Sequence, residues 1–257
     1  MTDRYSRYQE LKIDRPADRI LRITFDKPET YNSLDENGHR ELCEIWRDID
    51  GDPDTSAVIL TGAGKAFSSG GDFGMIERNI EDYQARCNAW KEARDLVYNV
   101  INCSKPIVSA MNGVAVGAGL VAGLLADISI IAKSARIVDG HTRLGVAAGD
   151  VSVINWPLLC EPIYGEDAER IGLVSLCVED DELQDKAMEI AQRLVKGAPS
   201  AIRWTKYALN NLYRMAGPAF DASTALEMLG FTGPEATEGL AALREKREPN
   251  FDPKSPL

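Results

Sequence analysis

Residues 105–125, KPIVSAMNGVAVGAGLVAGLL, decide the fold. Their first part, 106–111, is an apolar run that predicts a buried strand, and Asn112–Gly113 is a typical turn pair. Residues 117–125 predict a buried helix with small residues on one face. Asp127 closes the apolar stretch 113–126, which is too short for a membrane span of about 20 residues. Residues 128–132 predict another buried strand, so this stretch indicates an α/β core.

Predicted elements continue on both sides of this stretch. Residues 19–25 and 57–61 predict strands, and Asp35 is a good N-cap for a helix reaching about residue 49. One long helix is expected over roughly 79–102. Strands and helices alternate in the first part, and helices dominate later. The later helices are expected at 166–172, 182–196, 200–213, 218–230 and 235–246.

Composition excludes several classes of protein. The chain has 257 residues, 29 Lys and Arg, 40 Asp and Glu, and a net charge of −11. Such an acidic chain is a poor general binder of nucleic acids or membrane surfaces. Two histidines far apart in sequence disfavour a metal site, and five cysteines without CxxC spacing disfavour a disulfide framework or zinc site. The first 22 residues lack an apolar signal region, so we expect a cytoplasmic protein.

Two glycine-bearing stretches invite ligand-binding interpretations. Residues 117–123, followed about 20 positions later by Asp139, suggest a dinucleotide fingerprint, but the spacing is GxGxxxG instead of GxGxxG. Close packing of a helix on a strand is the favoured alternative. The loop 62–74 lacks the GxxxxGK[ST] pattern, yet its end, Gly70-Gly71-Asp72, could present main-chain N–H groups to an anion. An ordinary connection is equally compatible with it.

A third stretch, residues 138–150, places His141 and Asp150 among glycines and small apolar residues after a buried strand. A loop of this kind can hold a general base with a carboxylate that orients it. From spacing alone, a histidine satisfied by local hydrogen bonds is the favoured reading.

Several motifs together resemble the crotonase (enoyl-CoA hydratase/isomerase) superfamily, and the resemblance covers nearly the whole chain. The motifs are KPETYNSL at 27–34, VILTGAGKAFSSGGD at 58–72, KPIVSAMNGVAVGAG at 105–119, ADI at 126–128, Glu238-Gly239 and EKR at 245–247. The resemblance implies an α/β fold, a spiral of ββα units over residues 1–195, with a C-terminal helical trimerisation region over 196–257. It also implies homotrimers or dimers of trimers.

The resemblance further implies an acyl-CoA thioester substrate, in which coenzyme A is part of the substrate and no separate cofactor is needed. Main-chain N–H groups of Gly71 and Ala118 would bind the thioester oxygen as it becomes an enolate. Preorganised donors of this kind are often the largest catalytic contribution. Lys27 resembles a contact to the CoA phosphates, although a solvated loop lysine is an equal alternative. Asp72 is expected near the cofactor moiety, or as a residue that orders the loop.

Departures from the family pattern bear on the reaction. Hydratases of this superfamily use two glutamates, and Val121 and His141 stand at those positions. The His141 and Asp150 pattern is similar instead to its C–C bond hydrolases, which cleave β-diketones, although Ala118 replaces a further histidine of those enzymes. Three functions stay open: a hydratase- or isomerase-like enzyme that uses His141 and Asp150, a C–C hydrolase, and a non-catalytic acyl-CoA binder.

The sequence also predicts the surroundings of several large or charged side chains. Val121 and Trp156 are expected in the substrate pocket. Glu227 could face the pocket, but a surface carboxylate is the favoured expectation. Trp90 and Tyr98 are expected to pack or to line an apolar acyl site. The segment before Gly165 is shorter than the family pattern by about one helix, about 11–12 residues. We expect that residues omitted from the sequence explain this difference.

Overall fold

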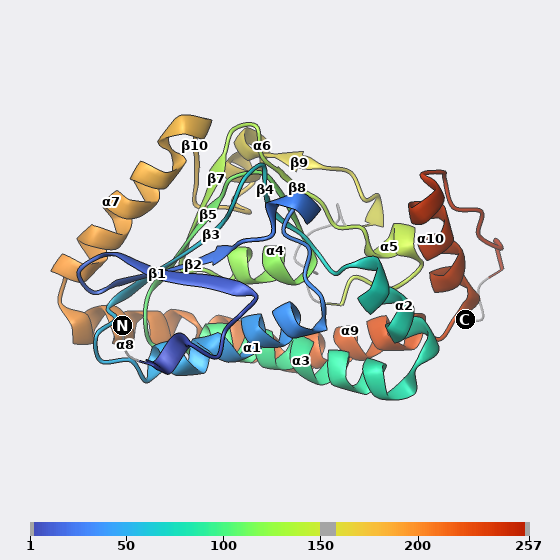
Figure 1. Cartoon of the computed structure of the whole chain (residues 1–257), viewed down its shortest axis with the longest axis horizontal. Helices are drawn as coiled ribbons and strands as arrows, with labels where there is room; N and C mark the ends of the chain where they lie inside the picture. Colours follow the sequence, from blue (N-terminus) through green and yellow to red (C-terminus); the bar gives the residue numbers. More distant parts are fainter. Residues whose placement is uncertain (1–2, 150–157, 255–257) are drawn as a thin grey trace.

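Two β-sheets organise the computed structural model, which describes residues 3–149 and 158–254 (Figure 1). The first sheet has the order β1-β2-β3-β5-β7-β10, and the second has the order β4-β6-β8-β9. Pairing is parallel except between β1 and β2 and between β8 and β9. The strands are β1 Leu11–Ala17, β2 Ile20–Phe25, β3 Ala57–Gly62, β4 Ala66–Ser69, β5 Ile107–Met111, β6 Val114–Val116, β7 Ile128–Ala132, β8 Arg136–Ile137, β9 Ile163–Tyr164 and β10 Leu176–Val178.

Helices cover the sheets and extend beyond them. They are α1 Glu36–Asp50, α2 Phe73–Glu81, α3 Tyr83–Asn102, α4 Gly117–Leu124, α5 His141–Leu144, α6 Gly165–Arg170, α7 Leu183–Lys196, α8 Pro199–Leu209, α9 Asn211–Gly230 and α10 Pro234–Glu245, with 3-10 turns at Asp3–Tyr5, Pro28–Thr30 and Asp180–Glu182. Among the described residues, no helix is long and apolar enough to cross a membrane.

The order of elements repeats three times. β3, β5 and β7 each enter the first sheet, and the next strand, β4, β6 or β8, enters the second sheet before a helix follows. Each repeat therefore turns the chain from one sheet to the other and back. This topology confirms the predicted α/β fold as a spiral of ββα units.

Apolar side chains of both sheets and of α1 form one continuous core. The 15-residue helix α1 begins at Asp35, whose side chain accepts a hydrogen bond from the main-chain N–H of Gly38 at 2.8 Å. Leu42, Ile45 and Trp46 lie on its buried face and are fully buried. Burying such a side chain contributes about 1.5–3 kcal/mol, so this helix is held mainly by packing.

The glycines of α4 serve close packing, as the favoured interpretation predicted. A Cβ atom at Gly119 would lie 2.4 Å from the Cβ atom of Ser68, and one at Gly123 would lie 3.1 Å from the ring of Phe67. These positions need glycine because α4 lies directly on β4. The stretch is thus a helix-packing surface, and the dinucleotide interpretation has no support.

The structure corrects several boundaries. The helix predicted over 79–102 is two helices, because Asp82 ends α2 and its side chain accepts hydrogen bonds from the main-chain N–H groups of Gln84 and Ala85 to begin α3. Pro218 lies inside α9 instead of starting a helix. The described stretch between Leu158 and Gly165 contains β9 and no α-helix before α6. The expectation of omitted residues stays a prediction.

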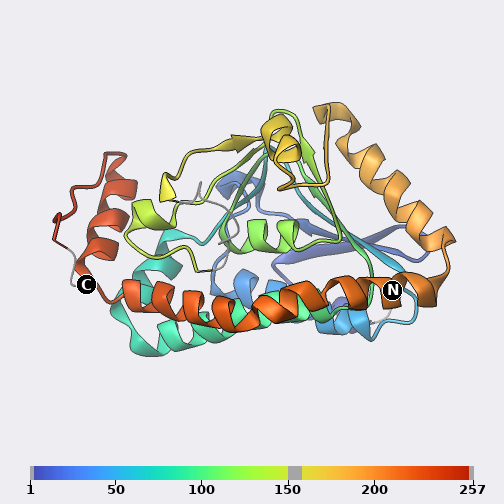
Figure 2. The same cartoon turned by 180° about the vertical axis from the view of Figure 1, so that it is seen from behind.

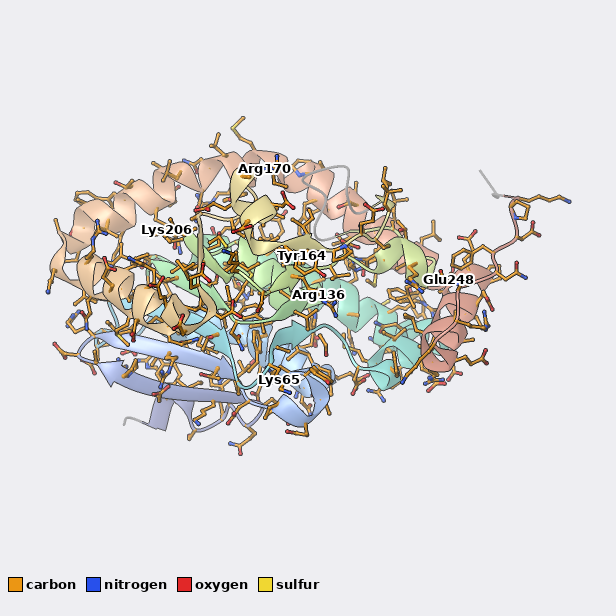
Figure 3. The ribbon with its side chains drawn as sticks, turned by 90° about the horizontal axis from the view of Figure 1, so that it is seen from above. Lys65, Arg136, Tyr164, Arg170, Lys206 and Glu248 are labelled. Carbon is orange, nitrogen blue, oxygen red and sulfur yellow. The ribbon has the colours of Figure 1, made fainter. Side chains whose placement is uncertain are left out.

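The C-terminal helices pack back on the core of the same chain. α9 runs alongside α3, and α10 packs against α2 and α5 (Figure 2). Lys206 of α8 is buried, where its Nζ atom pairs with Asp127 at 2.8 Å and donates to the main-chain carbonyl of Lys105 at 2.8 Å (Figure 3). Asn210 donates to the carbonyl of Ile101 at 2.8 Å. The division at residues 195 and 196 stays a prediction.

Candidate active site

Two glycine-containing loops leave the second sheet at the same edge. β4 and β6 are parallel and pair Ser69 with Val116, so the residues that follow each strand emerge side by side. Gly70 has a φ of +85° and Gly117 a φ of +56°, conformations that glycine adopts without the steric cost of a side chain. A Cβ atom at Gly117 would lie 3.1 Å from the Cα atom of Gly70. The two main-chain segments are therefore in contact.

Each loop offers a main-chain N–H group to a ligand. Ala118 is the second residue of α4, whose N-cap makes no side-chain capping bond, and the first N–H groups of a helix have no partner within it. The main-chain N–H of Leu34 donates to the carbonyl of Gly70 at 2.8 Å, and the carbonyl of Leu34 accepts from the N–H of Asp72 at 2.9 Å. The N–H group of Gly71, between these two residues, takes no part in this pairing. The structure thus places the predicted oxyanion donors, Gly71 and Ala118, on adjoining segments.

A cavity of about 430 Å³ lies beside these loops. Its wall includes the two glycine loops, the inner faces of α2 and α3, and residues from α1, α5, α9 and α10. The lining combines main-chain polar groups with mostly small or apolar side chains, which is typical of a small-molecule site. The described lining residues are His39, Ser69, Gly70, Gly71, Phe73, Met75, Ile76, Asn79, Ala89, Ala93, Val116, Gly117, Ala118, Val138, Gly140, His141, Arg143, Leu144, Cys160, Glu227, Met228, Phe231 and Leu243.

His141, the first residue of α5, lines this cavity and is oriented by Asp139. The Nδ1 atom of His141 lies 2.9 Å from Oδ1 of Asp139, and the main-chain N–H of His141 donates to the same oxygen at 3.0 Å. Burial raises the pKa of Asp139, but its hydrogen bonds and charge interaction with His141 lower it below its usual value overall. Asp139 is therefore a carboxylate that accepts a hydrogen bond from the Nδ1–H group, and in the neutral imidazole the basic lone pair is then on Nε2.

Glu227 brings a second carboxylate to His141 from the C-terminal helix α9. Its side chain is 9% exposed, and its Oε1 atom lies 3.7 Å from Nε2 of His141. The prediction that Glu227 is a surface carboxylate is wrong. A sequence signal exists, because Thr224, Glu227 and Phe231 are spaced by three and four residues, which places them on one helix face, and all three are buried.

Other predicted site residues lie elsewhere. Asp150 and Trp156 fall outside the described residues. Val121 is 3% exposed and packs in the main core, and it is not among the residues that line the cavity, so its expected pocket role is not supported. Asp139 was missed as the partner of His141, although the Asp-Gly-His sequence at 139–141 was a local signal for it.

Trp90 and Tyr98 also lie off this cavity. The guanidinium of Arg94 stacks over the ring of Trp90 at 4.8 Å, and Trp90 is 36% exposed. Tyr98 lines a separate apolar cavity of about 230 Å³ between α3 and α9, where its hydroxyl donates to Asp221 at 3.1 Å. Neither residue is among the described residues that line the cavity beside the glycine loops.

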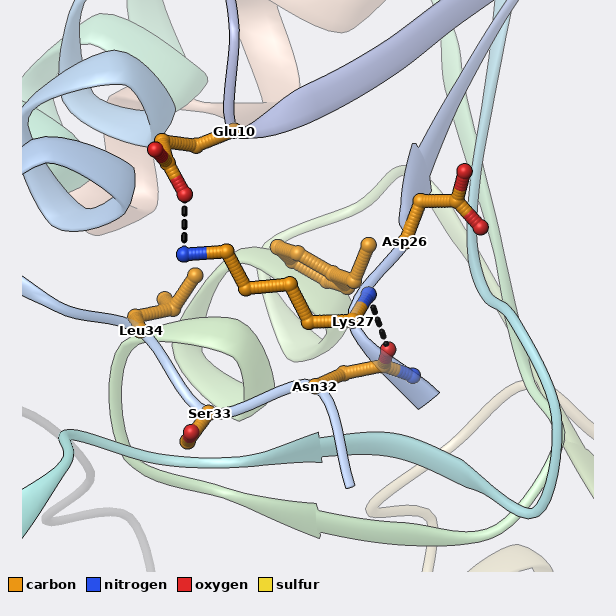
Figure 4. A pocket seen from close by; sticks show the side chains of 7 residues that line it. Glu10, Asp26, Lys27, Asn32, Ser33 and Leu34 are labelled. Carbon is orange, nitrogen blue, oxygen red and sulfur yellow. Dashed lines mark hydrogen bonds and ion pairs between the residues drawn. The ribbon is translucent and has the colours of Figure 1, made fainter. Parts of the chain in front are cut away.

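Lys27 and Asp72 have local structural partners. The Nζ atom of Lys27 pairs with the carboxylate of Glu10 (Figure 4). It also pairs with the carboxylate of Asp35 at 3.1 Å. These interactions raise the pKa of Lys27, and a bound phosphate would compete with them. Asp72 caps α2, since its Oδ1 atom accepts from the N–H of Met75 at 2.7 Å. Their contacts with coenzyme A stay predictions.

The enoyl-CoA hydratase/isomerase family model matches residues 16–254. The chain belongs to this family. A short-chain-enoyl-CoA hydratase from Clostridium acetobutylicum is 31% identical over 90% of this chain and 93% of that protein. An enoyl-CoA hydratase/isomerase structure from Mycobacterium paratuberculosis superposes with a TM-score of 0.85 at 28% identity, covering 90% of this chain and 97% of the other.

A hydrolase is also among the similar structures of this family member. A β-diketone hydrolase from the cyanobacterium Anabaena sp. PCC 7120 superposes with a TM-score of 0.81 at 25% identity, covering 90% of this chain and 98% of the other. Enzymes of different reaction classes thus share this fold. The family establishes an enzyme of the crotonase superfamily, whose members act on acyl-CoA thioesters, and the site must decide the reaction.

Proposed function

We propose that the protein catalyses a reaction of an acyl-CoA thioester that passes through an enolate held by the N–H groups of Gly71 and Ala118. The observation that carries this proposal is the convergence of both glycine loops and His141 on one cavity of about 430 Å³. The two N–H groups come from rigid segments, and one is at a helix N-terminus that favours negative charge.

His141 is the proposed general base. Its Nε2 atom takes a proton from the carbon next to the thioester carbonyl, and the electron pair left behind moves onto the carbonyl oxygen. Asp139 holds the Nδ1 proton and stabilises the imidazolium that forms. Glu227, at 3.7 Å from Nε2, is positioned to pass a proton between His141 and a second substrate atom. Asp150 stays a proposed partner of the same histidine.

Hydrolysis of a C–C bond is the second candidate reaction. It is supported by a histidine where hydratases of the family carry a glutamate, and by the structural likeness to a β-diketone hydrolase at 25% identity. In this reaction His141 activates water for attack on a ketone carbonyl. The adjacent C–C bond breaks, and its electrons form the enolate that the two N–H groups bind.

Four substrates separate these three reactions. Crotonyl-CoA reports hydration, a 3-enoyl-CoA reports isomerisation, and a β-ketoacyl-CoA together with a cyclic β-diketone reports C–C cleavage. We expect the wild type to turn over at least one of these substrates and the His141→Ala variant to lose that activity. Tight acyl-CoA binding without turnover of any of the four substrates would indicate a non-catalytic binder. Crotonyl-CoA hydration that survives His141→Ala would contradict the assigned base.

We also propose that the chain self-associates through α8 and α9. Large apolar side chains are exposed along these helices, and covering them against a second copy of the chain would remove apolar surface from water. Sedimentation velocity of the wild type and of Leu212→Glu tests this assignment: the wild type should be a trimer or larger, and the variant should shift toward monomers. The exposed residues are Trp204, Tyr207, Leu209, Leu212, Tyr213 and Met215.

A further inference from the structure

Two further polar side chains line the same cavity and come from elements other than α5, which carries His141. His39 of α1 and Asn79 of α2 both line the cavity, and they are only 7% and 6% exposed. They come from the part of the wall formed by α1, α2 and α3, where Ala89 and Ala93 also lie. Nothing in the proposed enolate chemistry uses either side chain.

The Nδ1 atom of His39 is already occupied. It lies 2.7 Å from Oε2 of Glu92 on α3, and the Sγ atom of Cys43 is 3.9 Å away. The thiol of Cys43 donates instead to the main-chain carbonyl of Glu92 at 3.1 Å. Among the residues that the structure describes, none hydrogen-bonds to Nε2 of His39. The ring is therefore anchored at one nitrogen, and its other nitrogen has no protein partner in the described chain.

The side-chain amide of Asn79, like Nε2 of His39, has no hydrogen-bond partner among the described residues. Arg86 donates instead to the main-chain carbonyl of Asn79 at 2.8 Å. Met75, Ile76 and Asn79 are spaced on one face of α2, and all three line the cavity, so the amide belongs to the face that a ligand would meet. The side chain of Asn79 therefore offers polar atoms at the cavity surface, where a polar ligand atom can hydrogen-bond to them.

The electrostatics of this part of the wall favour a neutral acceptor. Burial alone lowers the pKa of His39, but Cys43 and Glu92 raise it to about 10, which favours the imidazolium with an N–H on Nε2. Because Nδ1 is paired with Glu92, Nε2 is the ring nitrogen left for a ligand. The negative charge of Glu92 balances this cation. Asn79 can donate from its amide nitrogen. Two donors with no net charge match a carbonyl or hydroxyl oxygen better than a carboxylate.

We infer that His39 and Asn79 form a specificity subsite that binds an oxygen atom, a ketone or hydroxyl, on the acyl group of the substrate away from the thioester. This inference rests on the proposed acyl-CoA function and defines its substrate class. Ala89 and Ala93, one turn apart on α3, leave room beside the two polar side chains for the acyl chain.

Calorimetric binding of three saturated thioesters to the full chain tests this subsite. Hexanoyl-CoA is the apolar reference, 5-oxohexanoyl-CoA carries a neutral oxygen acceptor, and adipyl-CoA carries a terminal carboxylate. We expect 5-oxohexanoyl-CoA to bind at least about tenfold more tightly than hexanoyl-CoA, because its ketone oxygen can accept hydrogen bonds that the apolar chain cannot. Adipyl-CoA should gain less than the ketone.

Variants assign the preference to these residues. His39→Leu and Asn79→Leu should each reduce the ketone preference toward onefold, while His39→Gln, which keeps a polar group, should retain part of it. Asn88→Leu, an exposed position on α3, is the matched control and should keep the full preference. Circular dichroism melts verify that each variant is folded.

The outcomes separate this inference from the proposed function. Equal binding of hexanoyl-CoA and 5-oxohexanoyl-CoA by the wild type would overturn the subsite while leaving acyl-CoA binding intact. A ketone preference that persists in both folded leucine variants would also overturn it. Failure of all three thioesters to bind would instead contradict the proposed acyl-CoA function.

Discussion

The two histidines of the chain line one cavity in almost the same way, yet their surroundings differ. His39 pairs through Nδ1 with Glu92 at 2.7 Å, and His141 pairs through Nδ1 with Asp139 at 2.9 Å. His141 has Glu227 at 3.7 Å from Nε2 and shares the cavity with the glycine loops. His39 lies on the long helix α1 near Asn79, among small and apolar side chains.

This difference shows that a carboxylate-paired histidine does not define a base by itself. In the proposals made above, the groups around Nε2 distinguish a histidine that transfers a proton from one that binds a ligand. At His141 it meets a second carboxylate and the region where the enolate would form. At His39 it meets a part of the wall that has no other charged group besides Glu92 among the described contacts. The same pairing therefore supports proton transfer at one histidine and binding at the other.

The strongest test of the comparison is His141→Ala. Removing a general base costs about 10²–10⁴-fold in rate, so we expect a loss of kcat in that range on whichever substrate is turned over. Steady-state kinetics measure it. Gln192→Ala, exposed on α7, serves as the control and should match the wild type. A loss of less than tenfold would remove His141 from the chemistry.

The next largest effect is expected from Ala118→Pro, which deletes one proposed oxyanion donor. Proline lacks the N–H group and is tolerated in the first turn of a helix, so α4 should persist. Loss of one donor costs about 10²–10³-fold in kcat. Ala118→Gly keeps the N–H group and should lose much less. Similar kinetics of the two folded variants would contradict the role of this N–H.

Replacing the carboxylate that pairs with each histidine by an amide tests whether His141 and His39 have different roles. Asp139→Asn should lower kcat on the order of 10²-fold, because the amide no longer fixes the Nδ1 proton. Glu92→Gln should act mainly on the KM or Kd of acyl groups with a distal oxygen. Asp185→Asn on the exposed face of α7 is the matched control for the first substitution. Equal kcat losses in Asp139→Asn and Glu92→Gln would erase the proposed division of roles.

The smallest effect concerns stability against pH. The pKa of His39 is raised from 6.5 to about 10 in the folded chain, where Cys43 and Glu92 face the imidazole. The contribution of His39 to the free energy of unfolding is fully present below pH 6.5, and it is lost as the pH rises through about 10. The stability advantage of the wild type over His39→Gln should therefore shrink across this window. Urea unfolding at pH 6, 8 and 10 measures the difference, and a constant difference would contradict the shifted pKa.

The α/β class could be predicted from local apolar runs and caps, whereas the spiral of ββα units was implied only by the family resemblance. The apolar runs at 106–111 and 128–132 match β5 and β7 within one residue, and Asp35 caps α1 as expected. The short strands β4, β6 and β8 were missed, because two to four residues carry too little periodicity. Asp82 divides α2 from α3 by a capping interaction that a helical pattern alone does not reveal.

The candidate site was only partly predictable for a different reason. Gly71, Ala118 and His141 lie in recognisable motifs, and the structure places them around one cavity. Glu227 and His39 reach that cavity only through the packing of α9 and α1, about 90 and 100 positions from His141 in sequence, so spacing could not connect them. Sequence motifs identified the parts of the site that the chain builds locally, and tertiary packing supplied the rest.

Exchange of the α-protons of butyryl-CoA with solvent deuterium, followed by NMR, tests the central claim most directly. It requires only that the site forms an enolate, whatever reaction follows. We expect the wild type to exchange these protons, and we expect the exchange rate to fall about 10²-fold or more in both His141→Ala and Ala118→Pro. Exchange that continues at the wild-type rate in folded His141→Ala would contradict it, as would bound butyryl-CoA that never exchanges with the wild type.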